Sequence, residues 1–327
     1  MKVFLTGASG FVGSHVLDSL RADGHEVSIL LQATSSTRFI SRHLAEVIVH
    51  YGSLEDVPLL TKAMGGVEAV IHCAGKTKAL HSSDFYRVNQ AGTRHVVTAA
   101  NACRESVRHL VYISSLAVSG PGVPGCPAEE TGEPHPVSVY GRSKLLGEEE
   151  IRHHCRASWT ILRPAAVYGP RDAEFLSLFQ KVKQRLMPLL SGPKRSLNMV
   201  YGPDVASAVL STLTQDQGRG ETYHVAAEPP CTDEEFMEEI ARSMNVRPVR
   251  LRIPRPVLYL GCSIREILSH LTGRANMLNR QKLPELLAPG WVCTTDRIRH
   301  DLGFRAPTPL KEGISRTLEW YRREGWL

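Results

Sequence analysis

The sequence predicts an α/β fold in which a doubly wound parallel sheet is followed by a smaller C-terminal substrate-binding lobe. Three observations predict it: a glycine-rich turn after an initial apolar run, short apolar runs alternating with helical periodicity, and the lapse of this alternation in the last third. The length of 327 residues suits one large α/β domain with a smaller partner.

The organising stretch is the first one, from Lys2 to Ser14. The apolar residues 3–5 stop at Thr6-Gly7, and apolar residues then recur at helical spacing until Gly24, a helix stop signal. The order is therefore strand, glycine turn and helix.

Each glycine of the turn has a physical task. Gly7 would make the tight turn, Gly10 would let a pyrophosphate approach the backbone, and Gly13 would let helix and strand pack closely. A second apolar run at 27–31 completes a strand-helix-strand unit, which distinguishes a Rossmann dinucleotide-binding corner from a plain turn.

The alternation continues through the first two thirds of the chain. Further short apolar runs, separated by segments that can form helices, occur at 47–49, 69–71, 110–113, 160–162 and 223–225. Such runs predict parallel strands covered by helices on both faces.

The residue after the second strand discriminates between NAD and NADP. Many dinucleotide-binding folds place an acid there, which binds the adenosine ribose and repels a 2′-phosphate. This chain has Gln32, followed by hydroxyl side chains and Arg38. The pattern favours NADP over NAD, and a polar turn with a surface arginine is the structural alternative.

Small residues end the strand at 69–71. Cys73, Ala74 and Gly75 stand where the carboxyl edge of the sheet would face the cofactor, and close approach requires small side chains. In the next helical segment, Asn89 is either a cofactor contact or a helix-initiating polar residue.

A second group of residues suits proton transfer. The strand at 110–113 ends in Ser114 and Ser115, and a helical segment opening near residue 139 places Tyr140 and Lys144 one turn apart on one face. A nearby ammonium lowers the pKa of a phenol from about 10 toward neutrality, so Tyr140 could exchange a proton with a substrate oxygen held by Ser115. A surface pair and a capping serine are the structural alternatives.

Together these motifs make the chain resemble the extended short-chain dehydrogenase/reductases of the NAD-dependent epimerase/dehydratase family, most nearly the 3β-hydroxysteroid dehydrogenase and dihydroflavonol reductase branch. The resemblance covers nearly the whole length. The segments that carry it are Thr6-Gly7-Ala8-Ser9-Gly10-Phe11-Val12-Gly13, Asn89 with Gly92-Thr93, Ser115 with Tyr140 and Lys144, Leu162-Arg163-Pro164 through Tyr168-Gly169-Pro170, and Asp204-Val205-Ala206.

The resemblance implies an NAD(P)-dependent oxidoreductase that interconverts a secondary alcohol and a ketone or aldehyde. It makes Ser115, Tyr140 and Lys144 the catalytic triad, with Lys144 also holding the nicotinamide ribose. The cofactor contacts expected from the motifs and the resemblance together are Gly7, Ser9, Gly10, Phe11, Val12, Gln32, Arg38, Ser53, Leu54, Cys73, Ala74, Gly75, Asn89, Ser114, Tyr140, Lys144, Pro164 and Val167.

Departures from the family pattern narrow the reaction. Family dehydratases usually carry an acidic pair after the catalytic serine or threonine, where this chain has Leu116-Ala117. Sugar epimerases usually supply an asparagine where it has Ala165-Ala166, and an arginine for the diphosphate where it has Leu197, with Lys194-Arg195 nearby. An epimerase using the same triad and a redox-silent dinucleotide-binding protein stay open as alternatives.

The domain boundaries follow the alternation. Residues 1–168, joined by 201–227, are expected to form the dinucleotide-binding domain, and 169–200 with 228–327 the substrate-binding lobe and a C-terminal helix. Thr232 to Glu235 reads as a capping box that opens a helix to Met244.

Segment 253–268 is the most apolar stretch outside the sheet, and Arg265 and Glu266 interrupt it. It is too short and too charged to span a bilayer. Its amphipathic pattern favours a core-facing lid helix, with membrane-surface docking or an apolar substrate wall as alternatives. Its likeness to the steroid-dehydrogenase branch favours a small-molecule substrate of low polarity.

Composition limits the other partners. The net charge of +6 is spread along the chain, which argues against a nucleic-acid surface. Seven scattered cysteines suggest reduced thiols and no metal site. No signal segment precedes the first strand, so a cytoplasmic location is expected. The family's habit of pairing two Rossmann helices, one carrying Tyr140, leaves a homodimer open.

Overall fold

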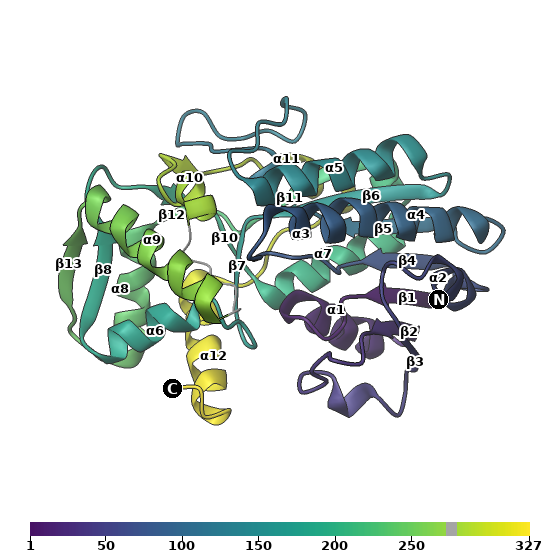
Figure 1. Cartoon of the computed structure of the whole chain (residues 1–327), viewed down its shortest axis with the longest axis horizontal. Coiled ribbons are helices and arrows are strands. Elements are labelled where there is room, and N and C mark those ends of the chain that lie inside the picture. The colour runs from purple at the N-terminus through teal and green to yellow at the C-terminus, as the bar shows by residue number, and fades with distance from the viewer. Residues whose placement is uncertain (273–279) are drawn as a thin grey trace.

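The computed structural model describes residues 1–272 and 280–327. Its larger part, the Rossmann part, is a seven-stranded sheet in the order β3-β2-β1-β4-β5-β6-β11, and every neighbouring pair is parallel. The predicted α/β, doubly wound fold is confirmed. The strands, at the right of Figure 1, are β1 (Lys2–Thr6), β2 (Glu26–Leu31), β3 (Ile48–Tyr51), β4 (Ala69–His72), β5 (His109–Ile113), β6 (Ser158–Pro164) and β11 (Glu221–Val225).

Helices cover both faces because successive side chains of a strand point to opposite sides of the sheet. In β1, Val3 and Leu5 enter one apolar core, whereas Phe4 enters the other. The helices of the first core are α1 (Phe11–Ala22), α7 (Gly202–Thr214) and α11 (Asp296–Leu302). Those of the second are α2 (Val57–Met64), α4 (Gly92–Ala102) and α5 (Val139–His154).

Short elements connect these layers. A five-residue α3 (Ser82–Tyr86) runs into a π-helical turn, η2 (Arg87–Ala91), which leads directly into α4. Single 3-10 turns are η1 (Ser41–His43), η3 (Leu116–Val118) and η4 (Asp216–Gly218). The π-turn is notable because such irregular turns often lie at functional sites.

The lobe, at the left of Figure 1, has an apolar core of its own, which joins α6, α8 and α12 with neighbouring strands. Its helices are α6 (Leu176–Lys183), α8 (Asp233–Met244), α9 (Arg255–Thr272), α10 (Leu283–Leu286) and α12 (Leu310–Arg323), with the turn η5 (Arg280–Lys282). Its strands are β8 (Leu186–Leu190), β9 (Ser196–Leu197), β12 (Cys231–Thr232), β13 (Val249–Ile253) and β14 (Gly290–Trp291). The pair β7 (Ala166–Tyr168) and β10 (Met199–Tyr201) lies between the lobe and the Rossmann part.

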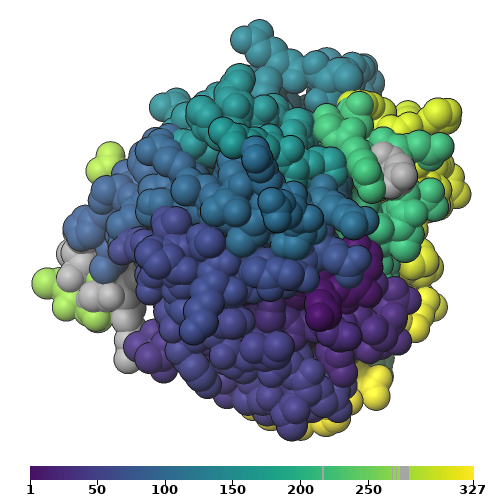
Figure 2. Space-filling view, turned by 90° about the vertical axis from the view of Figure 1, so that its right-hand side faces the viewer, coloured from purple at the N-terminus to yellow at the C-terminus, as the bar shows by residue number. Residues whose placement is uncertain are grey.

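The Rossmann part and the lobe sit end to end. Viewed from the Rossmann end, the surface consists mostly of the purple, blue and teal early segments, and green and yellow later segments show at its margins (Figure 2). The capping box predicted for α8 is present, since Glu235 N donates to Thr232 Oγ1 at 3.1 Å and Thr232 N to Glu235 Oε2 at 2.7 Å.

The apolar segment 253–268 forms most of α9, but the expectation that it faces the core is wrong for one side of the helix. Leu260 is 62% exposed and Leu268 52% exposed, whereas Cys262 is buried. The apolar residues recur at helical spacing, and that spacing does not reveal whether a neighbour covers them. Within the described residues, no helix has the length and apolar character needed to cross a bilayer.

Candidate active site

The glycine corner lies where β1 ends, between β1 and its neighbour β4. Gly7 has φ +77°, and a Cβ there would stand 2.6 Å from the backbone N of Ala74. A Cβ at Gly13 would stand 2.1 Å from the carbonyl oxygen of Gly7. Both positions therefore require glycine, one for the turn and one for the contact of helix and strand.

The corner fits the diphosphate of a dinucleotide. Gly10 is the N-cap of α1 and supplies no side chain to bond the first N–H groups, and the first turn contains no acidic residue. The N-terminal N–H groups of α1 thus lack a side-chain acceptor, and the positive end of the helix dipole favours an anion. Ser9, Phe11 and Val12 form the same turn, where the sequence places them.

A chain of buried hydrogen bonds joins the corner to the π-turn. Ala74 N donates to Thr6 Oγ1 at 3.2 Å, and Thr6 Oγ1 contacts His72 Nδ1 at 2.8 Å. His72 Nε2 contacts Thr93 Oγ1 at 3.0 Å, and Thr93 Oγ1 donates to the carbonyl of Asn89 at 2.7 Å. Thr93 donates its only hydroxyl proton to that carbonyl, so His72 Nε2 must donate to Thr93 Oγ1. The other ring nitrogen, His72 Nδ1, therefore accepts from Thr6 Oγ1.

That arrangement needs a neutral imidazole. Burial, assisted by the Lys144 charge, lowers the pKa of His72 to about 3, so the ring stays neutral at physiological pH. No role was predicted for this histidine from the sequence. The sequence signal for His72 is weak, because a histidine at the end of a buried strand is common. Its two threonine partners also come from separate elements, β1 and α4.

Asn89 ties the β4 loop to the helix that carries Tyr140. Its Oδ1 accepts from Lys76 N at 2.7 Å, and its Nδ2 donates to Lys76 O at 3.0 Å and to Ser143 Oγ at 2.9 Å. Asn89 is buried within the π-turn, in the interior of a continuous helical run rather than at its start. Gly75 lies beside it, since a Cβ at Gly75 would stand 3.3 Å from Asn89 Oδ1 and 3.6 Å from Lys144 Nζ.

Tyr140 and Lys144 occupy successive turns of α5, as the spacing predicts. Ser138 caps this helix by accepting from Gly141 N at 3.0 Å. Lys144 is buried; its Nζ donates to the carbonyl of Ile113 at 2.6 Å and lies 4.1 Å from the centre of the Tyr112 ring. Burial lowers the pKa of Lys144 to about 8.

The pKa of the Tyr140 phenol differs from the sequence-based expectation. Burial raises this pKa above its usual value, while a hydrogen bond with Ser115 acts in the opposite direction. The lowering expected from Lys144 is not among the main effects on this pKa, and desolvation of the phenol outweighs the others. Ser115 and Tyr140 nevertheless lie close to each other.

The adenosine end has a looser arrangement. Gln32 is exposed at the end of β2, and its N donates to Ser35 Oγ at 3.2 Å, which makes a polar turn. Arg38 forms an ion pair with Glu324 at 3.1 Å and lies 5.5 Å from the centre of the Trp326 ring. The arginine therefore already has partners at the C-terminus of the chain.

Five further residues were expected to contact the cofactor: Ser53, Leu54, Cys73, Pro164 and Val167. Leu54 packs against the position of Gly92, with its Cδ1 2.9 Å from where a Cβ would stand, and Ser53 Oγ accepts from Glu55 N at 3.2 Å. Pro164 ends β6 at the carboxyl edge, and Val167 lies in β7. Burial raises the pKa of Cys73 to about 12, so this thiol keeps its proton at neutral pH.

A buried ion pair fixes α5 on the sheet. Arg163 Nε and a terminal guanidinium nitrogen donate to the two Glu148 oxygens at 2.9 and 2.7 Å, and Ser114 Oγ donates to Glu148 Oε1 at 2.5 Å. Desolvation tends to raise the Glu148 pKa, but the Arg163 bonds prevail and hold it below its usual value. The Ser114 side chain is thus engaged in this network.

Two residues near Tyr140, Lys282 and Glu285, were missed from the sequence. Lys282 Nζ lies 5.2 Å from the centre of the Tyr140 ring, and Glu285 bonds both Lys282 and Ser138. The turn η5 and α10 therefore lie over the phenol. No sequence signal could have found this, because these residues follow Tyr140 by some 140 positions and belong to no motif.

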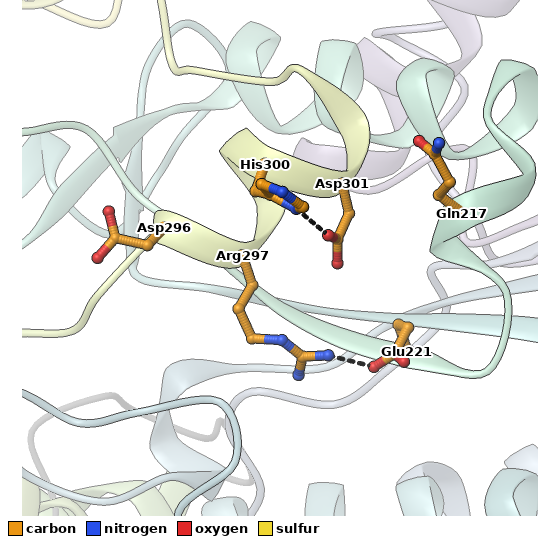
Figure 3. Close-up of a pocket in the computed structure, with 6 residues that line it drawn as sticks. All are labelled: Gln217, Glu221, Asp296, Arg297, His300 and Asp301. Carbon is orange, nitrogen blue, oxygen red and sulfur yellow. Dashed lines mark hydrogen bonds and ion pairs between the residues drawn. The ribbon is translucent and has the colours of Figure 1, made fainter.

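A surface hollow elsewhere does not belong to this site. It lies at the amino end of β11, opposite the carboxyl edge where the glycine corner and Lys144 lie. Its side chains pair with one another, Arg297 with Glu221 at 2.5 Å and His300 with Asp301 at 2.7 Å (Figure 3). The six that line it are Gln217, Glu221, Asp296, Arg297, His300 and Asp301.

Curated relatives match the chain over nearly its full length. A protein of Caulobacter vibrioides named ceramide reductase is 31% identical over 99% of this chain and 96% of its own length. The N-acetyl-alpha-D-glucosaminyl-diphospho-ditrans,octacis-undecaprenol 4-epimerase of Escherichia coli O157:H7 is 26% identical over 98% and 95%. The bovine (Bos taurus) decarboxylating sterol-4-alpha-carboxylate 3-dehydrogenase is 27% identical over 76% and 71%.

A solved structure shares the fold. The dTDP-glucose 4,6-dehydratase DesIV of Streptomyces venezuelae, solved with NAD bound, superposes with a TM-score of 0.80 over 100% of this chain and 98% of its own, at 21% identity. The sequence model of the NAD dependent epimerase/dehydratase family matches residues 3–226, which hold the glycine corner, Ser115, Tyr140 and Lys144. The chain belongs to the NAD dependent epimerase/dehydratase family, as its motifs predict.

Proposed function

We propose that this protein is an NAD(P)-dependent oxidoreductase that interconverts a secondary alcohol and a ketone or aldehyde, with NADP as the favoured cofactor. The observation that carries the proposal is that Tyr140 and buried Lys144 lie one turn apart on α5 at the carboxyl edge of the sheet, with Ser115 close enough to Tyr140 to lower the pKa of its phenol against the effect of burial. This edge also holds the glycine corner, where a dinucleotide diphosphate fits.

The chain's own residues account for the proton transfers. In the direction of reduction, Tyr140 donates its phenolic proton to the substrate oxygen, which Ser115 orients by hydrogen bond. A phenol whose pKa is raised by burial holds this proton at neutral pH, the state that reduction requires. Lys144, one helical turn from Tyr140, is the residue that would hold the nicotinamide ribose. The nicotinamide, when bound, supplies or accepts the hydride.

The preference for NADP rests on the end of β2. Gln32 brings no carboxylate that would repel a 2′-phosphate, and Arg38 lies six residues further along the same loop. Arg38 would have to exchange its exposed ion pair with Glu324 for the phosphate, and an exposed pair of this kind is weak.

A substrate of low polarity fits the same site. The segment after Arg163 offers Ala165-Ala166 in place of a polar side chain, and Arg195 is bound to Asp233 at 2.6 Å and is not available for a diphosphate. Ceramide, a polyprenyl diphosphate and a sterol, which appear in the names of three relatives, are all amphiphiles with a large apolar part. We therefore infer a lipid alcohol or ketone as the substrate class.

The test compares wild-type protein with Tyr140→Phe. Oxidation of NADPH is followed by absorbance with three probes: an N-acylated keto-sphingoid base, a keto-sterol and a long-chain alkanone. Loss of the acid should lower kcat/KM for the accepted ketone about 100-fold or more. The thermal shift with NADPH should stay close to that of wild type, because the variant removes one hydroxyl only.

Tyr259→Phe, which removes an exposed hydroxyl on α9, is the control and should keep full activity. Unchanged turnover in Tyr140→Phe would rule out the proton relay. The epimerase alternative, favoured by the relative from Escherichia coli, predicts cofactor retained through purification and no net change of NAD(P)H absorbance with any probe.

A further inference from the structure

The outer side of α9 carries a continuous apolar stripe. Its members are Val257, Leu260, Ile264, Leu268 and Leu271. We propose that this stripe docks the protein on the surface of an anionic lipid bilayer, with α9 lying in the plane of the membrane. Docking is argued from the helix itself. Only its purpose, access to a lipid substrate, rests on the proposed function.

The spacing of the stripe is that of one helix face. Steps of three, four, four and three residues keep the five side chains within roughly an 80° arc, and at 1.5 Å per residue they extend over about 21 Å. They are exposed by 56, 62, 49, 52 and 78%, in chain order. A face of this length and composition is typical of interfacial amphipathic helices.

The opposite side of α9 is packed against the protein. Cys262 is 1% exposed and Ser269 7% exposed, and both lie more than a quarter turn away from the stripe. The helix is therefore held in place by its buried side, and the stripe faces outward.

Exposed apolar side chains concentrate in this region. Of the eleven large apolar side chains that are exposed in the described part of the chain, six lie on α9 and two, Val249 and Leu251, on the preceding β13. Scattered exposed apolar residues are ordinary on a soluble protein, whereas a cluster marks an interaction site.

The charge around the stripe indicates that an anionic lipid surface binds there. Residues 246–272 contain five arginines and one acid, Glu266. Arg252, Arg255 and Arg265 are exposed and form no ion pair within residues 1–272 and 280–327. Basic side chains flanking an apolar helix face are attracted to anionic lipid headgroups.

A second copy of the chain fits this surface less well. A stable protein interface needs roughly 20–30 residues from each side, and it becomes depleted of charge at its centre. A narrow stripe with flanking arginines offers a smaller area, and two copies meeting there would bring like charges together.

The stripe is connected to the candidate active site. The α9 helix contacts η5, whose Lys282 lies over the Tyr140 ring. Docking of α9 would thus place the segment that covers the phenol at the membrane surface, where a lipid could enter without crossing water.

Flotation of the full-length protein with vesicles tests the proposal. Vesicles of phosphatidylcholine alone and of phosphatidylcholine mixed with phosphatidylglycerol are compared for wild type, the double variant Leu260→Glu/Leu268→Glu, and Ile48→Glu. Ile48 is 66% exposed on β3, at the opposite end of the molecule from α9 (Figure 1), and is the matched control.

Wild type and Ile48→Glu should float with the anionic vesicles, and the double variant should partition at least about tenfold less, because each buried leucine contributes strongly to insertion. Arg252→Gln and Arg265→Gln should each weaken binding to the anionic vesicles about fivefold and leave binding to neutral vesicles unchanged. The NADPH thermal shift of every variant should match that of wild type, which shows that each is folded.

Two results would overturn docking: wild type that stays at the bottom of the gradient with both vesicles, or a double variant that floats as well as wild type. A dimer in sedimentation that the double variant converts to monomer, without flotation, would assign the stripe to a second copy and also overturn it. Flotation of a protein that turns over none of the ketones would refute the proposed reaction and leave docking intact.

Discussion

Lys144 is a buried cation with few partners. Its Nζ has the Ile113 carbonyl at 2.6 Å and the face of the Tyr112 ring at 4.1 Å, and burial lowers its pKa from 10.5 to about 8. A buried charge costs stability unless it is fully compensated. Lys144, which the proposed chemistry needs, therefore lowers the stability of the cofactor-free fold.

This cost predicts a pH-dependent effect of Lys144→Met. Because the folded pKa of Lys144 lies below the unfolded one, the unfolded state binds more protons between these values, and the contribution of this group to stability rises with pH from about 8 to 10.5. The full penalty, about 3 kcal/mol, applies below pH 8. The variant should have the higher Tm near neutral pH, and the difference should shrink as the pH approaches 10.

Thermal unfolding of cofactor-free protein across this pH range provides the measurement. Lys183→Met, which removes an exposed ammonium, should leave Tm nearly unchanged at every pH. A Tm difference for Lys144→Met that is constant with pH would contradict the buried-charge account.

At the scale of elements, α5 is the helix on which the site depends. It supplies Tyr140 and Lys144, and the ion pair of Glu148 with Arg163 of β6 holds it against the sheet, with both side chains at most 1% exposed. Breaking a buried pair from one side leaves a charge without its partner, which is far more costly than losing an exposed pair.

We therefore expect Arg163→Leu to lower the free energy of unfolding by about 3 kcal/mol, the lower end for a buried pair, because Arg152 still donates to Glu148 Oε2 at 2.8 Å. Arg94→Leu is the control, because Arg94 pairs with Glu150 of the same helix but is 56% exposed, and it should cost about 1 kcal/mol or less. Urea unfolding measures both. Equal losses in the two variants would show that burial does not set the strength of these pairs.

At the scale of the whole molecule, contacts between distant segments join the Rossmann part to the two ends of the C-terminal helix α12. Arg38 pairs with Glu324 just after this helix, and Asp204 accepts from Thr308 just before it at 2.7 Å. The loop that would meet the adenosine end of the cofactor is thus attached to the end of the chain.

Arg38→Ala separates the two roles of this arginine. If Arg38 binds the 2′-phosphate, the variant should lose about tenfold or more in affinity for NADP and little for NAD, since a bond to a charged group is worth about 1.5–3 kcal/mol. The exposed pair with Glu324 should contribute at most about 1 kcal/mol to stability. Titration calorimetry with both cofactors measures the affinities.

Arg42→Ala is the matched control, because Arg42 is exposed in the same region and pairs with Asp18. It should leave the affinities for both cofactors unchanged. Equal losses for NAD and NADP in Arg38→Ala would indicate a purely structural role and remove the main support for NADP.

Local features of the sequence predicted the Rossmann part well. The glycine corner, the short apolar runs of the strands and the (i, i+4) spacing of Tyr140 and Lys144 are local patterns, which depend mainly on neighbouring residues. The family and the sheet follow from them and are confirmed. The roles of Ser115, Tyr140 and Lys144 stay predictions until the variants above are measured.

Other features depend on which segments meet in space. The neutral state of His72, the raised pKa of Tyr140, the position of Lys282 over its ring and the outward-facing side of α9 are all properties of burial. An apolar helix face has the same sequence whether a neighbour covers it or not. The sequence thus determined the family and the Rossmann sheet, and the tertiary structure decided which groups of the candidate site are desolvated, because desolvation arises only when distant segments pack together.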